Sequence, residues 1–254
     1  MTALAPGRRA VQACGAALGA GTRRRAGSEG VAMALDGLRW GPKSGGAARQ
    51  LVVLLHGVGA DGNDLIDLAP AWAPALPDAV FVAPHGPEAY DNQVPGGLSE
   101  GAGRQWFSLA DRSPDVLLAG AGRAAPLLDA YVAAELERLG LGPDAVALMG
   151  FSQGAMMTLH AGLRRRVAPR GLLAYSGALL DSPDLASACT GHPPTLLAHG
   201  EADEVVPFGR AQAAEAALHR LGIPLQTLWR PGLGHAIDDI GLATGALFLQ
   251  RLFA

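Results

Sequence analysis

The chain has 254 residues, of which 49% are hydrophobic and 17% charged, so it can bury one full-sized core and differs from disordered and collagen-like sequences. Its 20 basic and 23 acidic residues give a formal net charge of -3, which argues against a nucleic-acid partner. No apolar run approaches the roughly 18 residues that span a bilayer, and two cysteines cannot form a disulfide framework, so we expect a cytoplasmic protein without stable membrane insertion.

Residues 1–32 are expected to form a poorly ordered N-terminal extension. They consist mainly of Ala, Gly and Arg and have neither helical nor strand periodicity. A targeting segment and an upstream start, with Met33 as the original first residue, remain open alternatives. Residues 33–254 hold 15 basic and 22 acidic residues, a formal charge of about -7, so the domain that we expect there is mildly acidic.

From residue 51 onward, short apolar runs alternate with helical patterns. Continuous apolar runs are typical of strands buried on both faces of a parallel sheet, and they occur at residues 51–55, 79–82, 145–149, 172–175, 195–198 and 225–229. Helical periodicity occurs at residues 64–75, 114–139, 153–164, 209–221 and 235–252. The alternation predicts one α/β domain over residues 33–254, with a mostly parallel sheet covered by helices on both faces.

The longest stretch without periodicity, residues 84–111, is rich in Gly and polar residues. Loops of this length inside compact domains are usually functional or mobile. We find no long apolar insertion of the kind that forms a large lipase lid, which favours small acyl esters over an emulsified lipid surface.

Residues 150–154 read Gly-Phe-Ser-Gln-Gly, a G-x-S-x-G motif between a predicted strand and a predicted helix. In that context the motif predicts a nucleophile elbow, in which Ser152 lies on a cramped turn and flanking glycines leave room for the neighbouring elements. The backbone N–H of Gln153, at the start of the helix, then points to where an oxyanion would form.

A serine nucleophile needs a base and an orienting acid, and in this arrangement the chain order is Ser, acid, His. His235 is the preferred base because it lies in a Gly-flanked loop, where no packing role calls for an imidazole. His199 continues a strand and His219 belongs to a helical pattern that indicates a surface position, so both are weaker candidates.

The acid comes from the segment after the strand at residues 195–198. Glu201, Asp203 and Glu204 compete there within four positions, and a solvated acidic loop is the alternative interpretation. Spacing alone leaves the choice open.

Four segments together resemble the phospholipase/carboxylesterase family of small α/β-hydrolases, which includes the acyl-protein thioesterases. They are Leu-Leu-His-Gly-Val-Gly-Ala-Asp-Gly at 54–62, Gly-Phe-Ser-Gln-Gly-Ala-Met at 150–156, His-Gly-Glu-Ala-Asp-Glu-Val-Val-Pro at 199–207, and Gly-His at 234–235. The resemblance runs from about residue 50 to the C-terminus.

This resemblance implies an α/β-hydrolase fold and a triad of Ser152, Asp203 and His235, with the second oxyanion N–H on Val58. Many relatives have Pro where this chain has Glu204, a change that removes a backbone constraint but no catalytic atom. The extension before residue 33 has no counterpart in the family.

The implied chemistry is hydrolysis of a carboxylic ester, thioester or lysophospholipid through an acyl-enzyme. An acyltransferase that uses the same intermediate, and a hydrolase-fold protein that binds a ligand without turnover, are the alternatives. We expect no metal and no cofactor, because the histidines are dispersed and the Gly-rich turn after the first strand has neither a dinucleotide nor a Walker pattern. A small-molecule acyl ester is the expected partner, and homodimerisation is left open.

Substrate preference has a weaker basis in the sequence. Trp106, within Gln-Trp-Phe at 105–107, resembles a segment near the acyl pocket of bacterial relatives, so it is a candidate pocket wall. An aromatic residue that holds a long loop to the core is the alternative. Met156 and Met157 are expected in the core.

Overall fold

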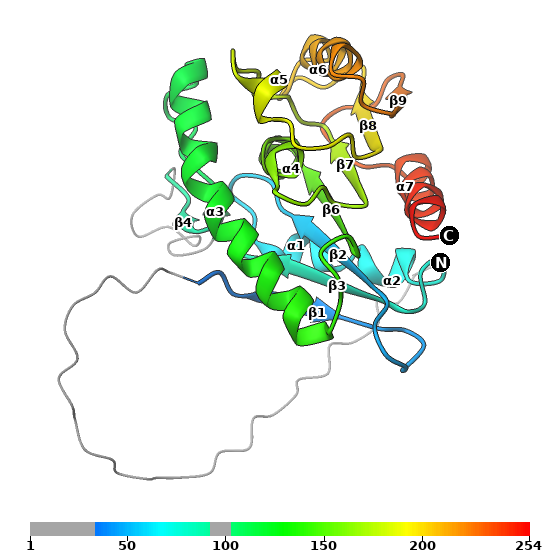
Figure 1. Ribbon diagram of the computed structural model, residues 1–254. Helices are drawn as coiled ribbons and strands as arrows, with labels where there is room; N and C mark the ends of the chain where they lie inside the picture. Colours follow the sequence, from blue (N-terminus) through cyan, green and yellow to red (C-terminus); the bar gives the residue numbers. More distant parts are fainter. Residues whose placement is uncertain (1–33, 92–102) are drawn as a thin grey trace, which may run out of the picture. The chain divides into compact units, whose positions relative to one another are not determined.

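The computed structural model describes residues 34–91 and 103–254, and Figure 1 shows a twisted sheet with helices packed against it. The strands of the main sheet are β1 (Gly37–Trp40), β2 (Gln50–Leu55), β3 (Ala79–Pro84), β6 (Val146–Phe151), β7 (Gly171–Tyr175), β8 (Thr195–Gly200) and β9 (Leu225–Arg230). They lie in the order β1-β3-β2-β6-β7-β8-β9. All neighbours run parallel except β1, which pairs antiparallel with β3.

Helices cover both faces of this sheet. They are α1 (Gly62–Ile66), α2 (Ala69–Trp72), α3 (Pro114–Leu139), α4 (Gln153–Arg164), α5 (Leu185–Ala188), α6 (Gly209–Arg220) and α7 (Asp239–Leu252). The predicted α/β architecture, a mostly parallel sheet between helices, is confirmed. A separate pair of two-residue strands, β4 (Glu88–Ala89) and β5 (Arg104–Gln105), lies within the long segment without periodicity.

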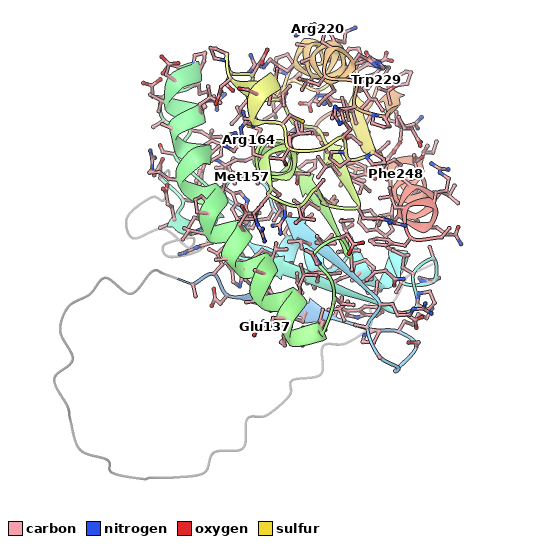
Figure 2. All side chains as sticks on the ribbon, viewed as in Figure 1. Glu137, Met157, Arg164, Arg220, Trp229 and Phe248 are labelled. Atoms are coloured by element: carbon pink, nitrogen blue, oxygen red, sulfur yellow. The ribbon has the colours of Figure 1, made fainter. Side chains whose placement is uncertain are left out.

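Alternate residues of the central strands serve two separate cores. Leu51 and Val53 of β2 belong to the core under α3, α4 and α6, whereas Val52 belongs to the core under α2 and α7. Met157 and Phe248, labelled in Figure 2, lie in the first and second core respectively. Burial on both faces explains why these strands are continuous apolar runs in the sequence.

Helix α3 alone among the described helices is long and apolar enough to meet a length-and-composition test for a membrane span. Nine of its residues are buried, and its apolar stripe contributes Leu128, Val132 and Leu136 to the core that it shares with α4. A core helix of a folded domain meets the same test.

Two predicted elements need correction, and one strand was missed. The helix predicted at residues 64–75 is two short helices, because Pro70 at the start of α2 lacks the N–H that would continue the hydrogen-bond ladder. Helix α7 begins at Asp239 and not at residue 235, since the Asp238 side chain caps it by accepting from the Gly241 N–H at 2.8 Å. Strand β1, a four-residue edge strand, was not predicted.

Two predictions concern segments beyond the described residues. The extension at residues 1–32 lies outside them, so its predicted lack of order stays a prediction. Residues 92–102 of the predicted long loop also lie outside them.

Candidate active site

Ser152 lies on a sharp turn between β6 and α4. Its backbone has φ 55° and ψ -118°, which is strained for a residue with a side chain. A Cβ at Gly154 would overlap the carbonyl oxygen of Leu55, and one at Gly150 would overlap that of Gly154. The motif therefore needs both glycines for space.

Asp203 and His235 come together although 32 positions separate them. The Nδ1 atom of His235 lies 2.8 Å from Oδ2 of Asp203, whose side chain has no exposed surface. The other carboxylate oxygen, Oδ1, accepts from the backbone N–H groups of Val205 and Val206, each at 2.9 Å. The carboxylate is thus fixed at both oxygens. Because its contact with His235 uses Nδ1, the other ring nitrogen, Nε2, is the one that can accept a proton.

The environment of Asp203 favours its ionised form. Burial by itself raises the pKa of the carboxyl, but the hydrogen bonds from His235, Val206 and Val205 outweigh that effect and hold the pKa below its usual value. Glu201 and Glu204, the competing acids of the sequence analysis, are both exposed.

His199 is a contact of the acid that was not identified from the sequence. It is buried at the end of β8, with Nε2 at 2.8 Å from the carbonyl oxygen of Val206 and 3.3 Å from Oδ2 of Asp203. His219, the other weaker candidate, is exposed on α6.

The imidazole of His235 also packs beside the elbow. Its ring centroid lies 4.8 Å from that of Phe151, the residue before Ser152. Within the described part of the chain, no hydrogen bond joins the Ser152 hydroxyl to His235. Catalytic hydrogen bonds of this kind are often long in the absence of substrate.

The two candidate oxyanion donors, Val58 and Gln153, both lie near Ser152. Gly57 is so near that a Cβ there would approach the Ser152 Cβ to 3.4 Å, and Val58 lines the same pocket as Ser152. Neither the backbone N–H of Val58 nor that of Gln153 has a hydrogen-bond partner among the described residues. Both groups are therefore free to donate to a bound oxygen.

The Val58 loop is held on two sides. The N–H of Gly59 donates to the Arg104 carbonyl at 2.8 Å, and the Arg104 N–H donates to the carbonyl of Ala60 at 2.7 Å. Buried His56 accepts the Gly86 N–H at Nε2, at 2.8 Å, so its proton is on Nδ1, which lies 2.7 Å from the Gly57 carbonyl. Burial lowers the pKa of His56, which keeps it neutral in this role.

The side chain of Gln153 ties the elbow to the loop at residues 105–107. Its Oε1 accepts from the Trp106 N–H at 3.0 Å, and its Nε2 donates to the Phe107 carbonyl at 2.6 Å. Trp106 has no exposed surface, and its indole N–H donates to the His56 carbonyl at 3.0 Å. It does not line the pocket beside Ser152, so its contacts favour the alternative interpretation, an aromatic residue that holds a loop to the core.

A pocket of about 260 Å³ opens beside Ser152. Its walls are mainly apolar, and its lining residues are Val58, Leu109, Arg112, Leu117, Ser152, Met156, Ala178, Val205, Val206, Pro207 and Arg210. Met157 is buried in the core as expected, and partly buried Met156 packs against the same core while it also lines the pocket. The described residues contain no group of three or more His, Cys, Asp or Glu side chains that could hold a metal ion.

The chain is similar to several known proteins. A model of the family described as Phospholipase/Carboxylesterase matches residues 43–252. The chain is 35% identical to esterase YpfH of Escherichia coli K12 over 198 residues, which cover 76% of the chain and 78% of that protein. It is 28% identical to acyl-protein thioesterase 1 of Gibberella zeae, over 79% of the chain and 89% of that protein. The crystal structure of esterase PE8 superposes with a TM-score of 0.79 at 40% identity, covering 87% of the chain and all of that structure.

Proposed function

Because the chain belongs to the phospholipase/carboxylesterase family and is therefore an ester-hydrolysing enzyme with an α/β-hydrolase fold, we propose that it works through an acyl-enzyme on Ser152. The observation that carries this proposal is the 2.8 Å contact between buried Asp203 and His235, beside the strained serine of the elbow. Small acyl esters are its substrates.

In the first step the Ser152 Oγ attacks the carbonyl carbon of the ester. His235 takes the hydroxyl proton at Nε2, because Nδ1 is engaged with Asp203. Asp203 holds this tautomer and stabilises the imidazolium that forms. The negative charge that develops on the carbonyl oxygen is received by the N–H groups of Val58 and Gln153, which have no other partner among the described residues.

The tetrahedral intermediate then collapses. The alcohol or thiol leaves with the proton from His235, and the acyl group stays on Ser152. A water molecule, deprotonated by the same imidazole, attacks the acyl-enzyme through a second tetrahedral intermediate and releases the acid.

The test replaces the nucleophile and leaves the rest intact. Ser152→Ala should abolish turnover of p-nitrophenyl acetate and butyrate and block labelling by a fluorophosphonate, whereas Ser187→Ala, at an exposed serine of α5, should leave both unchanged. Labelling that persists in Ser152→Ala would place the nucleophile elsewhere. A chain-length series of esters, thioesters and lysophospholipids then defines the acyl and leaving groups, and an added alcohol acceptor tests acyl transfer against hydrolysis.

A further inference from the structure

Two arginines line the pocket that contains Ser152, and the mechanism above does not use them. Arg112 lies on the loop that leads into α3, and Arg210 lies in the first turn of α6. Both are exposed, and neither side chain has an ion pair or hydrogen bond among the described residues.

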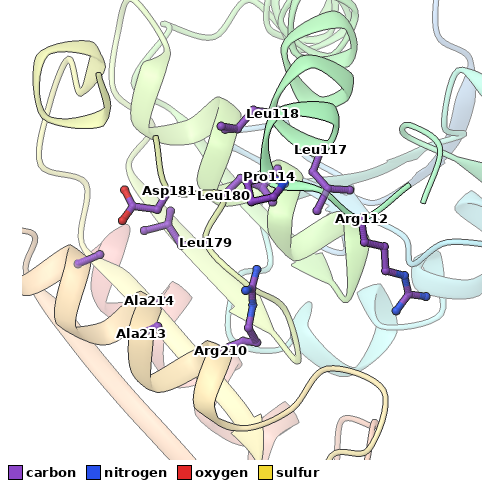
Figure 3. A pocket seen from close by; sticks show the side chains of 11 residues that line it. Arg112, Pro114, Leu117, Leu118, Leu179, Leu180, Asp181, Arg210, Ala213 and Ala214 are labelled. Atoms are coloured by element: carbon purple, nitrogen blue, oxygen red, sulfur yellow. The ribbon is translucent and has the colours of Figure 1, made fainter. Parts of the chain in front are cut away.

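The same two residues also line a second hollow. This outer hollow, of about 210 Å³, shares Arg112, Leu117 and Arg210 with the pocket of Ser152, so the arginines lie where the two spaces meet. Figure 3 shows Arg210 projecting from the start of α6 into the outer hollow, with Arg112 on the loop before α3. A ligand that extends from Ser152 into the outer hollow therefore passes both Arg112 and Arg210.

The side chains that line this junction carry more positive than negative charge. Among the residues that the structure describes, no acidic side chain lines the pocket of Ser152, and the one that lines the outer hollow, Asp181, points away from Arg210 in Figure 3. Helices α4 and α6 begin here with no acidic residue in the first turn and no side-chain cap, so their N-terminal dipoles add to the positive potential. Helix α3 also begins here, at Pro114, but Asp115 in its first turn offsets its dipole. Residues 33–254 carry a formal charge of about -7, which makes this junction a local exception.

From this arrangement, and resting on the proposed esterase function, we propose that Arg112 and Arg210 select esters that carry an anionic group, such as a carboxylate or phosphate. The scissile carbonyl binds at Ser152 while the anionic group lies at the junction of the two hollows. Guanidinium groups match the planar geometry of carboxylate and phosphate oxygens, and here they have no competing partner among the described side chains.

The test compares matched substrates that differ by one charge. The monoester of adipic acid with p-nitrophenol and p-nitrophenyl hexanoate have the same acyl length, and only the first has a terminal carboxylate. The kcat/KM ratio of the charged to the neutral ester should fall about fivefold for Arg112→Met and for Arg210→Met, a change of about 1 kcal/mol for a partly exposed pair. Met keeps an apolar stem, so the ratio isolates the charge from wall packing.

Two further variants make the result specific. Arg210→Lys keeps a positive charge at this position and should therefore retain most of the wild-type kcat/KM ratio that Arg210→Met loses. Arg220→Met removes an exposed arginine from the far end of the same helix and should leave the ratio unchanged. Raising the salt concentration should reduce the preference for the charged ester in the wild-type protein and much less in Arg210→Met.

A second substrate pair shows whether the anionic group that the arginines bind belongs to the acyl group or to the leaving group of the ester. The acetate esters of 4-hydroxybenzoate and 4-hydroxybenzamide carry the charge difference on the leaving group. A loss of preference confined to this pair would assign the anionic group to the leaving group, and one confined to the adipate pair would assign it to the acyl group. An unchanged ratio for both pairs in Arg112→Met and Arg210→Met, or an equal fall in Arg220→Met, would overturn the proposal. If the wild-type protein hydrolyses none of these esters, the proposal that small acyl esters are its substrates fails.

Discussion

Replacing Asp203 by Asn tests whether this residue orients the base. Two backbone N–H groups, from Val205 and Val206, donate to Oδ1, so the amide oxygen of the substituted side chain should occupy that position and its NH₂ group the position of Oδ2. The NH₂ group then donates to Nδ1 of His235, which now lies 2.8 Å from Oδ2. That contact forces the proton onto Nε2, the wrong tautomer for a base that must accept from Ser152.

We expect kcat to fall about 10⁴-fold, the loss associated with the wrong tautomer in triads, which corresponds to about 5.5 kcal/mol of transition-state stabilisation. The fold should survive, because the oxygen in the Oδ1 position keeps its two donors. Exposed Glu201 and Glu204 provide matched controls, and their Gln variants should stay within about tenfold of wild-type kcat because solvent and salt screen their charges.

The assay is kcat on p-nitrophenyl acetate, with the melting temperature of each variant as a check on folding. Activity of Asp203→Asn within tenfold of wild type, with Glu201→Gln the damaging change, would refute the assignment of the acid. Ser152 and His235 could still stand in that case.

The remaining predictions concern stability. Burial by itself raises the pKa of Glu135, but the hydrogen bonds from Arg39 and Arg138 have a larger, opposite effect, and the pKa is lower than its ordinary 4.5. The ion pairs of Glu135 with Arg39 and Arg138 therefore stabilise the fold above about pH 4.5, and this contribution is lost as the pH falls through the folded-state pKa of Glu135. Glu135→Gln should lower the melting temperature at pH 7 and make the melting temperature fall less steeply as the pH is lowered. An equally steep fall in the variant and the wild type would contradict the argument. A chain that starts at Met33 should keep its activity and its melting temperature, and a loss of roughly 2 to 4 °C would reveal about 1 kcal/mol of packing by the segment before it.

The parts of the fold that could be predicted are those with local causes. Helix α3 has a long periodic pattern with Pro114 at its start and Gly140 after its end, and the structure has it at the predicted bounds. Edge strand β1 could not be found in this way. It has four residues, and its strand conformation depends on pairing with β3 across about 40 positions of sequence.

The same division applies to the candidate site. The elbow is a local motif, so the position of Ser152 between β6 and α4 followed from the sequence. The contact of His199 with Asp203 could not be predicted, because it depends on how the chain turns back after β8. Met156 packs against the core as expected, but the sequence does not show that it also lines the pocket.

The strand order has a consequence for synthesis of the chain. Strand β2 lies inside the sheet, next to the central strand β6, but β6 follows about 95 residues later, with Leu51 beside Val146. At roughly 5–20 residues per second, a ribosome needs about 5 to 20 s to supply that partner. During this interval one edge of β2 has no strand to pair with, and Leu51 and Val53 lack helices α4 and α6, which complete their core and follow β6 in the chain. Such an apolar edge is a template for association with other chains, so the nascent protein has its greatest need of chaperones before β6 emerges.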